Sequence, residues 1–246
     1  MLQNENIYLF LLILPIVSFL YSSVGHGGAS GYLALMALFS FAPETMKPTA
    51  LLLNLFVAGI SFYYYYKEGY FNKKLFITFA IASIPLAFFG GTIEIDASIY
   101  KKVLAILLVF AILKMLNVFG KESKNIQEVK LWQGLVVGGI IGFFSGLIGI
   151  GGGIILTPII LLLHWGNMKE AAAVSALFIW VNSAAGLVGQ LSSGITIEKE
   201  SFILVTIAII GGVLGGYYGS KKINNQNLRY ILAFVLIIAS GKLFFT

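Results

Sequence analysis

Two glycine clusters interrupt long apolar stretches of this sequence. The first lies in residues 22–31, SSVGHGGASG, and the second in residues 145–158, SGLIGIGGGIILTP. Glycine is a poor helix former and adopts backbone angles that other residues avoid, so a helix is expected to break at each cluster. Inside a membrane, the polar backbone groups of a broken helix are tolerated only where protein covers them or where they line a cavity. The two breaks are therefore the first candidates for a binding site.

A membrane location follows from the composition. Of the 246 residues, 59% are hydrophobic and 11% are charged. Soluble domains carry charge on about a quarter of their residues, so we predict a multi-pass protein of the cell (cytoplasmic) membrane, surrounded by the lipid bilayer. The net charge of +6 arises from lysines in short loops between apolar runs, where positive charge sets membrane orientation. Nucleic acid is therefore not an expected partner.

The apolar runs predict an all-α polytopic fold with an internal repeat. Ten helical segments, two of them short, are expected over residues 7–23, 29–42, 48–66, 75–93, 98–118, 131–149, 153–165, 170–191, 201–219 and 228–245. At an offset of 124 residues, glycines of the two clusters align: Gly25, Gly27 and Gly28 with Gly149, Gly151 and Gly152. We predict a first membrane repeat over 1–120, a charged connecting loop over 121–130 and a second membrane repeat over 131–246. Each repeat is expected to hold a glycine-broken helical hairpin plus three membrane helices.

The loop charges decide whether each broken segment crosses the membrane or turns back. If it turns back, one face carries ten basic residues: Lys67, Lys73, Lys74, Lys121, Lys124, Lys130, Lys169, Lys221, Lys222 and Arg229. The other face then carries four: Lys47, Lys101, Lys102 and Lys199. If it crosses, the same residues divide seven against seven. Because cytoplasmic loops are enriched in Lys and Arg, the first arrangement is favoured, with two inverted repeats and both termini outside.

Enzyme motifs are missing from this sequence. It has no H-E-x-x-H, no G-x-S-x-G and no Walker-type G-x-x-x-x-G-K-[ST] pattern. Cysteine is absent, and the two histidines, His26 and His164, lie far apart without carboxylate partners. We therefore expect neither an enzyme nor a bound cofactor or metal.

The breaks have a direct use in anion binding. A helix that begins after a break presents free N–H groups and the positive end of its dipole, so a small anion is the expected substrate. The predicted substrate-binding residues are the break glycines and nearby polar side chains: Gly25, His26, Gly27, Gly28, Ser30, Asn54, Gly149, Gly151, Gly152, Gly153, Thr157, Ser175 and Asn182. Two alternatives remain open, namely that the glycines only permit close helix packing and that the hydroxyls bond their own helices. Packing is the favoured interpretation for the other membrane glycines: Gly138, Gly139, Gly142, Gly146, Gly211, Gly212, Gly215 and Gly216.

His26 sets the first cluster apart from the second. The aligned position in the second half is Ile150. Imidazole titrates near neutral pH, so His26 is a candidate proton carrier, and the alternative is a hydrated histidine at the mouth of the loop.

The order of these features resembles the sulfite exporter TauE/SafE family. The resemblance rests on the G-x-G-G-G break at 149–153, the stretch IILTPIILLL at 154–163, and the following Ala/Ser-rich helix with Asn-Ser, all echoed in the first half. It implies a small membrane carrier for sulfite, sulfoacetate or another small sulfur-containing anion. It assigns to the family motif Gly149, Gly151, Gly152, Gly153, Thr157 and Pro158, and in the first half Gly25, Gly27 and Gly28. The first half departs from the family pattern at His26, Ala29 and Ser30, which leaves the substrate open.

These inferences lead to one hypothesis and two alternatives. The hypothesis is a secondary transporter that holds a small sulfur-containing anion at opposed helix N-termini and moves it by alternating access. The alternatives are an anion-selective channel and a membrane scaffold protein without transport. The direction of transport, the coupling ion and the oligomeric state, including a homodimer, stay open.

Overall fold

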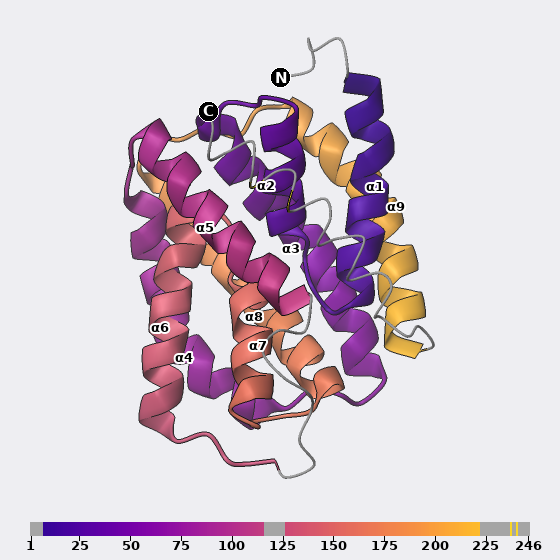
Figure 1. Ribbon diagram of the computed structural model, residues 1–246, viewed down its shortest axis with the longest axis vertical. Helices are drawn as coiled ribbons and strands as arrows, with labels where there is room; N and C mark the ends of the chain where they lie inside the picture. Colours follow the sequence, from indigo (N-terminus) through magenta and orange to yellow (C-terminus); the bar gives the residue numbers. More distant parts are fainter. Residues whose placement is uncertain (1–6, 116–125, 222–236, 238–239, 241–246) are drawn as a thin grey trace.

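The computed structural model describes residues 7–115 and 126–221, together with Ile237 and Ser240. Every regular element in this part of the chain is a helix (Figure 1). Five of the helices are long and apolar enough to cross a membrane: α3 (Pro43–Lys67), α4 (Lys73–Thr92), α6 (Leu131–Ile148), α8 (Met168–Ser192) and α9 (Glu200–Lys221). The prediction of an all-α, multi-pass membrane protein is confirmed.

The remaining helices are α1 (Ile7–Ser23), α2 (Ala29–Leu38), α5 (Ala97–Met115) and α7 (Gly153–Leu162). Helix breaks occur at both glycine clusters, as predicted. The predicted start of the third segment at residue 48 is wrong, because α3 begins at Pro43. Proline lacks an N–H and has a helical φ, so it fits the first turn of a helix. The tenth predicted segment, 228–245, lies outside the described residues except for Ile237 and Ser240, which are helical.

Each break joins two antiparallel arms (Figure 1). From the end of the molecule where α1 begins, α1 runs inward and α2 returns toward that same end. From the opposite end, α6 runs inward, and α7 returns toward the end at which α6 begins. We call α1 with α2 the first hairpin and α6 with α7 the second hairpin. The two hairpins therefore open toward opposite ends of the molecule.

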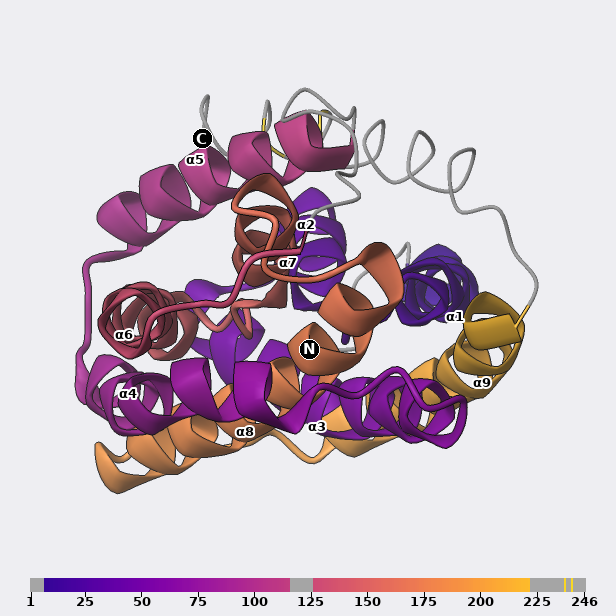
Figure 2. The ribbon, with the colours of Figure 1, turned by 90° about the horizontal axis from the view of Figure 1, so that it is seen from below.

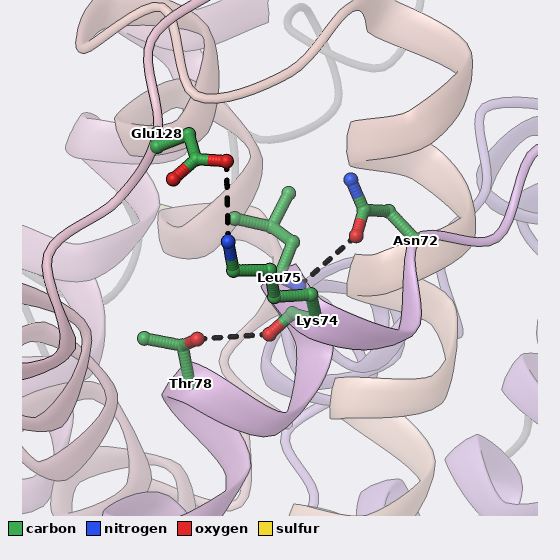
Figure 3. Close-up of polar contacts among 5 residues, drawn as sticks. All are labelled: Asn72, Lys74, Leu75, Thr78 and Glu128. Atoms are coloured by element: carbon green, nitrogen blue, oxygen red, sulfur yellow. Dashed lines mark hydrogen bonds and ion pairs between the residues drawn. The ribbon is translucent and has the colours of Figure 1, made fainter.

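Polar contacts hold together the end at which the second hairpin opens. Asn72 caps α4 by accepting a hydrogen bond from the Leu75 N–H, and Lys74 forms an ion pair with Glu128 at 3.1 Å (Figure 3). The backbone N–H of Gln127 donates to the His164 carbonyl at 2.7 Å. These contacts join the segment before α6 to the start of α4 and to the connection between α7 and α8.

The basic residues in the described part of the chain lie at two ends of the molecule. The described members of the larger predicted group lie at the end where α3 and α9 finish and α4, α6 and α8 begin: Lys67, Lys73, Lys74, Lys130, Lys169 and Lys221. The smaller group lies toward the other end: Lys47, Lys101, Lys102 and Lys199. Lys121, Lys124, Lys222 and Arg229 are outside the described residues. Which end faces the cytoplasm stays a prediction.

Glycines bring pairs of long helices into backbone contact. A Cβ on Gly142 of α6 would collide with the Ser83 carbonyl of α4, and a Cβ on Gly215 of α9 would collide with the Phe19 carbonyl of α1. Gly138, Gly146 and Gly211 make the same kind of contact. Small residues let membrane helices approach closely, so the packing interpretation of these glycines is confirmed.

The helices form layers (Figure 2). One layer contains α4, α8, α3 and α9, with α3 and α8 packed against each other at its centre. The two hairpins form the next layer, and α5 crosses its outer side. Both breaks therefore face the central pair of helices, α3 and α8.

Candidate functional site

The first glycine of each break contacts the central helix of the other half of the chain. Gly25 has φ +78°, and a Cβ there would lie 2.8 Å from the Cα of Ala172 on α8. Gly149 has φ +82°, and a Cβ there would lie 3.1 Å from the Cα of Lys47 on α3. Both positions need a left-handed backbone and room for a neighbouring helix, and glycine alone meets both needs easily. The halves are thus interlocked at the breaks.

The next glycines contact the central helix of their own half. A Cβ on Gly27 would meet the side chains of Asn54 and Ala58 on α3. A Cβ on Gly151 would meet Ile179 and Ser183 on α8, and also the amide nitrogen of Asn54. Asn54 therefore touches both breaks.

Asn54 links the start of α2 to α8. Its Oδ1 accepts a hydrogen bond from the Ala29 N–H at 3.0 Å, and its Nδ2 donates to the Ser183 hydroxyl at 3.1 Å. The side chain is fully buried. A mid-helix amide in a membrane needs such partners, because no water replaces them. Asn54 is thus placed at the junction of the two breaks, where the sequence predicted a site residue.

His26 reaches from the first break into the second half of the chain. Its Nε2 lies 3.2 Å from the Thr157 hydroxyl on α7, and that hydroxyl lies 2.7 Å from the hydroxyl of Ser175 on α8. Thr157 also lies within hydrogen-bond distance of its own helix, 3.1 Å from the Gly153 carbonyl. The His26 side chain is 4% exposed, so it is not a hydrated group at a loop mouth. Three predicted site residues therefore form one buried hydrogen-bonded chain.

Two predicted residues have other partners. Ser30 donates to the Tyr21 hydroxyl at 2.8 Å, between the arms of the first hairpin. Asn182 donates through Nδ2 to the Phe178 carbonyl of its own helix at 2.7 Å, and its buried Oδ1 has no hydrogen-bond partner among the described residues. The structure thus brings Asn54 to the breaks and leaves Asn182 bonded to its own helix.

Both short helices begin within the protein at glycines. Gly28 precedes α2 and Gly152 precedes α7, both in the left-handed region, and neither helix has a side-chain cap on its own N-cap residue. Gly153, also predicted as a site residue, contacts Ile179. A helix N-terminus carries a partial positive charge, so these two ends supply positive potential at the breaks. At the start of α2 the Ala29 N–H already donates to Asn54.

Lys47 is a residue that sequence reasoning misplaced. It was assigned to a loop, but it lies in the second turn of α3 and is 7% exposed. Its Nζ lies 5.1 Å from the centroid of the Tyr100 ring, and its backbone contacts Gly149. The early helix start at Pro43 is the signal that places Lys47 inside the helix. Ser183, the partner of Asn54, is one of the polar side chains expected at the depth of the site, although it was not among the predicted binding residues.

Known proteins resemble this chain over almost its whole length. The family model for the sulfite exporter TauE/SafE matches residues 9–243. A probable membrane transporter protein of Sinorhizobium fredii is 34% identical over 233 residues, which cover 93% of this chain and 94% of that protein. A probable membrane transporter protein of Methanocaldococcus jannaschii is 31% identical, covering 92% of this chain and 94% of that protein. No solved structure matches.

The family match agrees with the glycine breaks and with the membrane-length helices. It describes membrane transporters and not enzymes, in agreement with the missing enzyme motifs. The resemblance inferred from the sequence is therefore confirmed. This chain belongs to the sulfite exporter TauE/SafE family of membrane transporters.

Proposed function

We propose that the protein is a secondary carrier that moves a small sulfur-containing anion across the cytoplasmic membrane by alternating access. Sulfite, a sulfonate such as sulfoacetate, and related oxyanions are the substrate class. The observation that supports this most directly is the pair of helix N-termini, at Gly28 and Gly152, that begin inside the protein beside the shared residue Asn54. Such ends attract anions without a fully charged side chain in the membrane.

Inverted repeats supply the movement in this proposal. The two hairpins open toward opposite ends, and the first glycine of each break packs on the central helix of the other half. When two similar units interlock in this way, rocking one against the other opens the shared site to one end or the other. The larger group of basic residues marks the cytoplasmic end, which puts the amino terminus outside.

The burial of the site favours a carrier over a channel. Asn54 and Ser175 are fully buried, and Thr157 and His26 are nearly so. An open channel needs a continuous water-filled path past its selective residues. We therefore treat the structure as a closed state, from which each side is reached by a rearrangement.

Transport in proteoliposomes tests the proposal. We expect saturable uptake of labelled sulfite or sulfoacetate that is accelerated by unlabelled anion on the other side of the membrane. Electrical conductance that rises linearly with anion concentration, without such acceleration, would point to the channel instead.

A binding assay with a matched pair of variants tests the site. Gly152→Leu fills the start of α7, where a Cβ meets Ile141 and Phe178, whereas Gly194→Leu changes another left-handed glycine that has no neighbour within 4 Å. We expect the anion to stabilise wild type and Gly194→Leu against thermal unfolding, and to leave Gly152→Leu unaffected. Folding is checked by circular dichroism and gel filtration. Unchanged binding in folded Gly152→Leu would exclude this site.

The absence of cysteine makes the orientation easy to test. A single cysteine at Lys199 or at Lys73 reports on opposite ends of the molecule. In intact cells, a membrane-impermeant maleimide should label Lys199→Cys and spare Lys73→Cys. The reverse pattern would invert the proposed topology.

A further inference from the structure

The hydrogen bonds of His26 define which ring nitrogen carries the proton. Nδ1 lies 2.9 Å from the Val24 carbonyl oxygen, which can only accept a hydrogen bond. Nδ1 is therefore protonated in either charge state. Nε2 faces the Thr157 hydroxyl at 3.2 Å and is the atom that gains or loses a proton.

Counting donors shows that this proton sets the direction of the hydrogen bond between His26 and Thr157. When Nε2 is unprotonated, it accepts the single proton of the Thr157 hydroxyl, and Ser175 donates to Thr157. When Nε2 is protonated, it donates to Thr157, whose own proton is released toward the Gly153 carbonyl or toward Ser175. When the Thr157 proton goes to the Gly153 carbonyl, protonation of His26 adds a hydrogen bond to the residue that begins α7.

The Val24 carbonyl and the Thr157 hydroxyl, which lie within hydrogen-bond distance of the His26 ring, carry no charge. From α7 and α8 it faces hydroxyls, Thr157 and Ser175. On α3, the Tyr65 hydroxyl donates to the carbonyl of Ser23, close to the break. At the start of α8, Lys169 donates to the carbonyls of Gly219 and Ser220, and it also interacts electrostatically with Glu68, which follows α3. An imidazolium at this buried position is unfavourable beside two helix N-termini, and a bound anion offsets that cost.

We propose that His26 takes up a proton at Nε2 when the anion binds between the two helix N-termini, so that anion and proton occupy the carrier together. The proton comes from water, and one is taken up per anion. This inference rests on the proposed anion site and names the coupling ion. It also gives the first break a role that Ile150 cannot have in the second, because Ile150 has no titratable group.

Calorimetry of anion binding tests the coupling in detergent-solubilised full-length protein. Thiosulfate and sulfoacetate are suitable probes because their charges stay constant from about pH 5.5 to about pH 8.5, a range that brackets the ordinary histidine pKa. Sulfite is unsuitable because it titrates near neutral pH. Titrations in two buffers of different ionisation enthalpy count the protons. We expect nearly one proton taken up per anion at the alkaline end, and an affinity that falls by up to about tenfold per pH unit there.

The two histidines provide a matched pair of variants. His164 also has its Nδ1 beside a backbone carbonyl, that of Leu161 at 3.0 Å, but it lies in the connection between α7 and α8. His26→Gln keeps a polar group of similar reach that does not titrate. We expect His26→Gln to bind the anion without proton uptake and with the same affinity at every pH, and His164→Gln to behave like wild type.

Nitrogen NMR of the two labelled histidines reports the protonation of each ring nitrogen directly, before and after the anion is added. We expect neutral His26 to carry its proton on Nδ1, and to become doubly protonated when thiosulfate is added near neutral pH. Anion binding without proton uptake in wild type, or proton uptake that persists in His26→Gln, would overturn the inference and leave the proposed carrier intact. Absence of binding by every anion tested, at every pH, would overturn both.

Discussion

The two glycine breaks have the same backbone plan and different side chains. Each starts with a left-handed glycine, Gly25 or Gly149, packed on the opposite central helix. His26, Thr157 and Ser175 form a polar, hydrogen-bonded series. At the predicted repeat offset of 124 or 125 residues, the equivalent positions are apolar: Ile150, Leu33 and Ala50. All three equivalents belong to one buried apolar cluster. The two breaks therefore share the left-handed glycine and its packing on a central helix, whereas the histidine and its hydroxyl partners have no polar counterparts at the predicted repeat offset.

Hydrogen bonding also differs between the two halves. In the first, Tyr21 bonds Ser30, and Tyr65 donates to the Ser23 carbonyl at 2.9 Å. The equivalent positions in the second half are Ser145 and Gln190. Gln190 donates weakly to the Gly146 carbonyl at 3.4 Å. In the part of the chain that the structure describes, the buried Ser145 hydroxyl and Gln190 Oε1 have no hydrogen-bond partner. Polar groups are thus better satisfied around the first break than around the second.

The largest expected effect comes from adding a Cβ at the first break. Gly25→Ala combines a left-handed backbone with a collision against α8, so we expect a loss of about 3–5 kcal/mol of unfolding free energy. Gly149→Ala has looser contacts, with a closest distance of 3.1 Å, and should lose about 2 kcal/mol. Gly69→Ala is the control, with φ +79° and no neighbour within 4 Å, and should lose about 1 kcal/mol. Denaturant titration in detergent measures all three, and equal losses for Gly25→Ala and Gly69→Ala would refute the interlocking contact.

Replacing Asn54 should reduce stability more than replacing Asn182, just as replacing Gly25 should reduce it more than replacing Gly149. Asn54→Leu leaves the Ala29 N–H and the Ser183 hydroxyl without their partner, so we expect a loss of about 2–3 kcal/mol and weakened anion binding. Asn182→Leu removes a bond within its own helix and an unpartnered oxygen, so its stability should change by less than about 1 kcal/mol. Thermal unfolding with and without anion distinguishes them, and a larger loss for Asn182→Leu would reverse the assignment.

Adding a histidine at the second break tests whether that break can accommodate the side chains of the first. Ile150→His puts a polar ring into an apolar cluster and should lose about 1–3 kcal/mol. Adding Leu33→Thr and Ala50→Ser supplies the equivalent hydroxyls and should recover roughly half of that loss. Stability of the single and triple variants is compared in the same detergent. A triple variant no more stable than the single one would show that hydroxyls at positions 33 and 50 do not reach a histidine at position 150.

The smallest changes in stability are expected at Tyr65 and Ser145. Tyr65→Phe loses its bond to the Ser23 carbonyl and should lose about 1 kcal/mol. Ser145→Ala removes an unpartnered hydroxyl and should leave stability unchanged or raise it by up to about 1 kcal/mol. A clear loss of stability in Ser145→Ala would indicate a partner for this hydroxyl.

Much of the fold was predictable because its signals are local. Apolar runs interrupted by glycine or proline locate helices, and the predicted 7–23 and 75–93 lie close to the observed α1 and α4 (Lys73–Thr92). Glycines spaced four apart, such as Gly138 and Gly142, mark close helix contacts for the same reason. Lys47 was misplaced because the apolar run begins at residue 48, whereas α3 begins at Pro43 and contains Pro48 within its second turn.

The sequence by itself determined the class of protein, the helices, the two breaks and the candidate side chains. Only the tertiary structure decided which of those side chains meet. Asn54 and Asn182 look alike in sequence, but one joins the two breaks and the other bonds its own helix. His26 finds its partner at Thr157, 131 residues away. Helix formation depends on nearby residues, whereas these contacts depend on how separate helices pack.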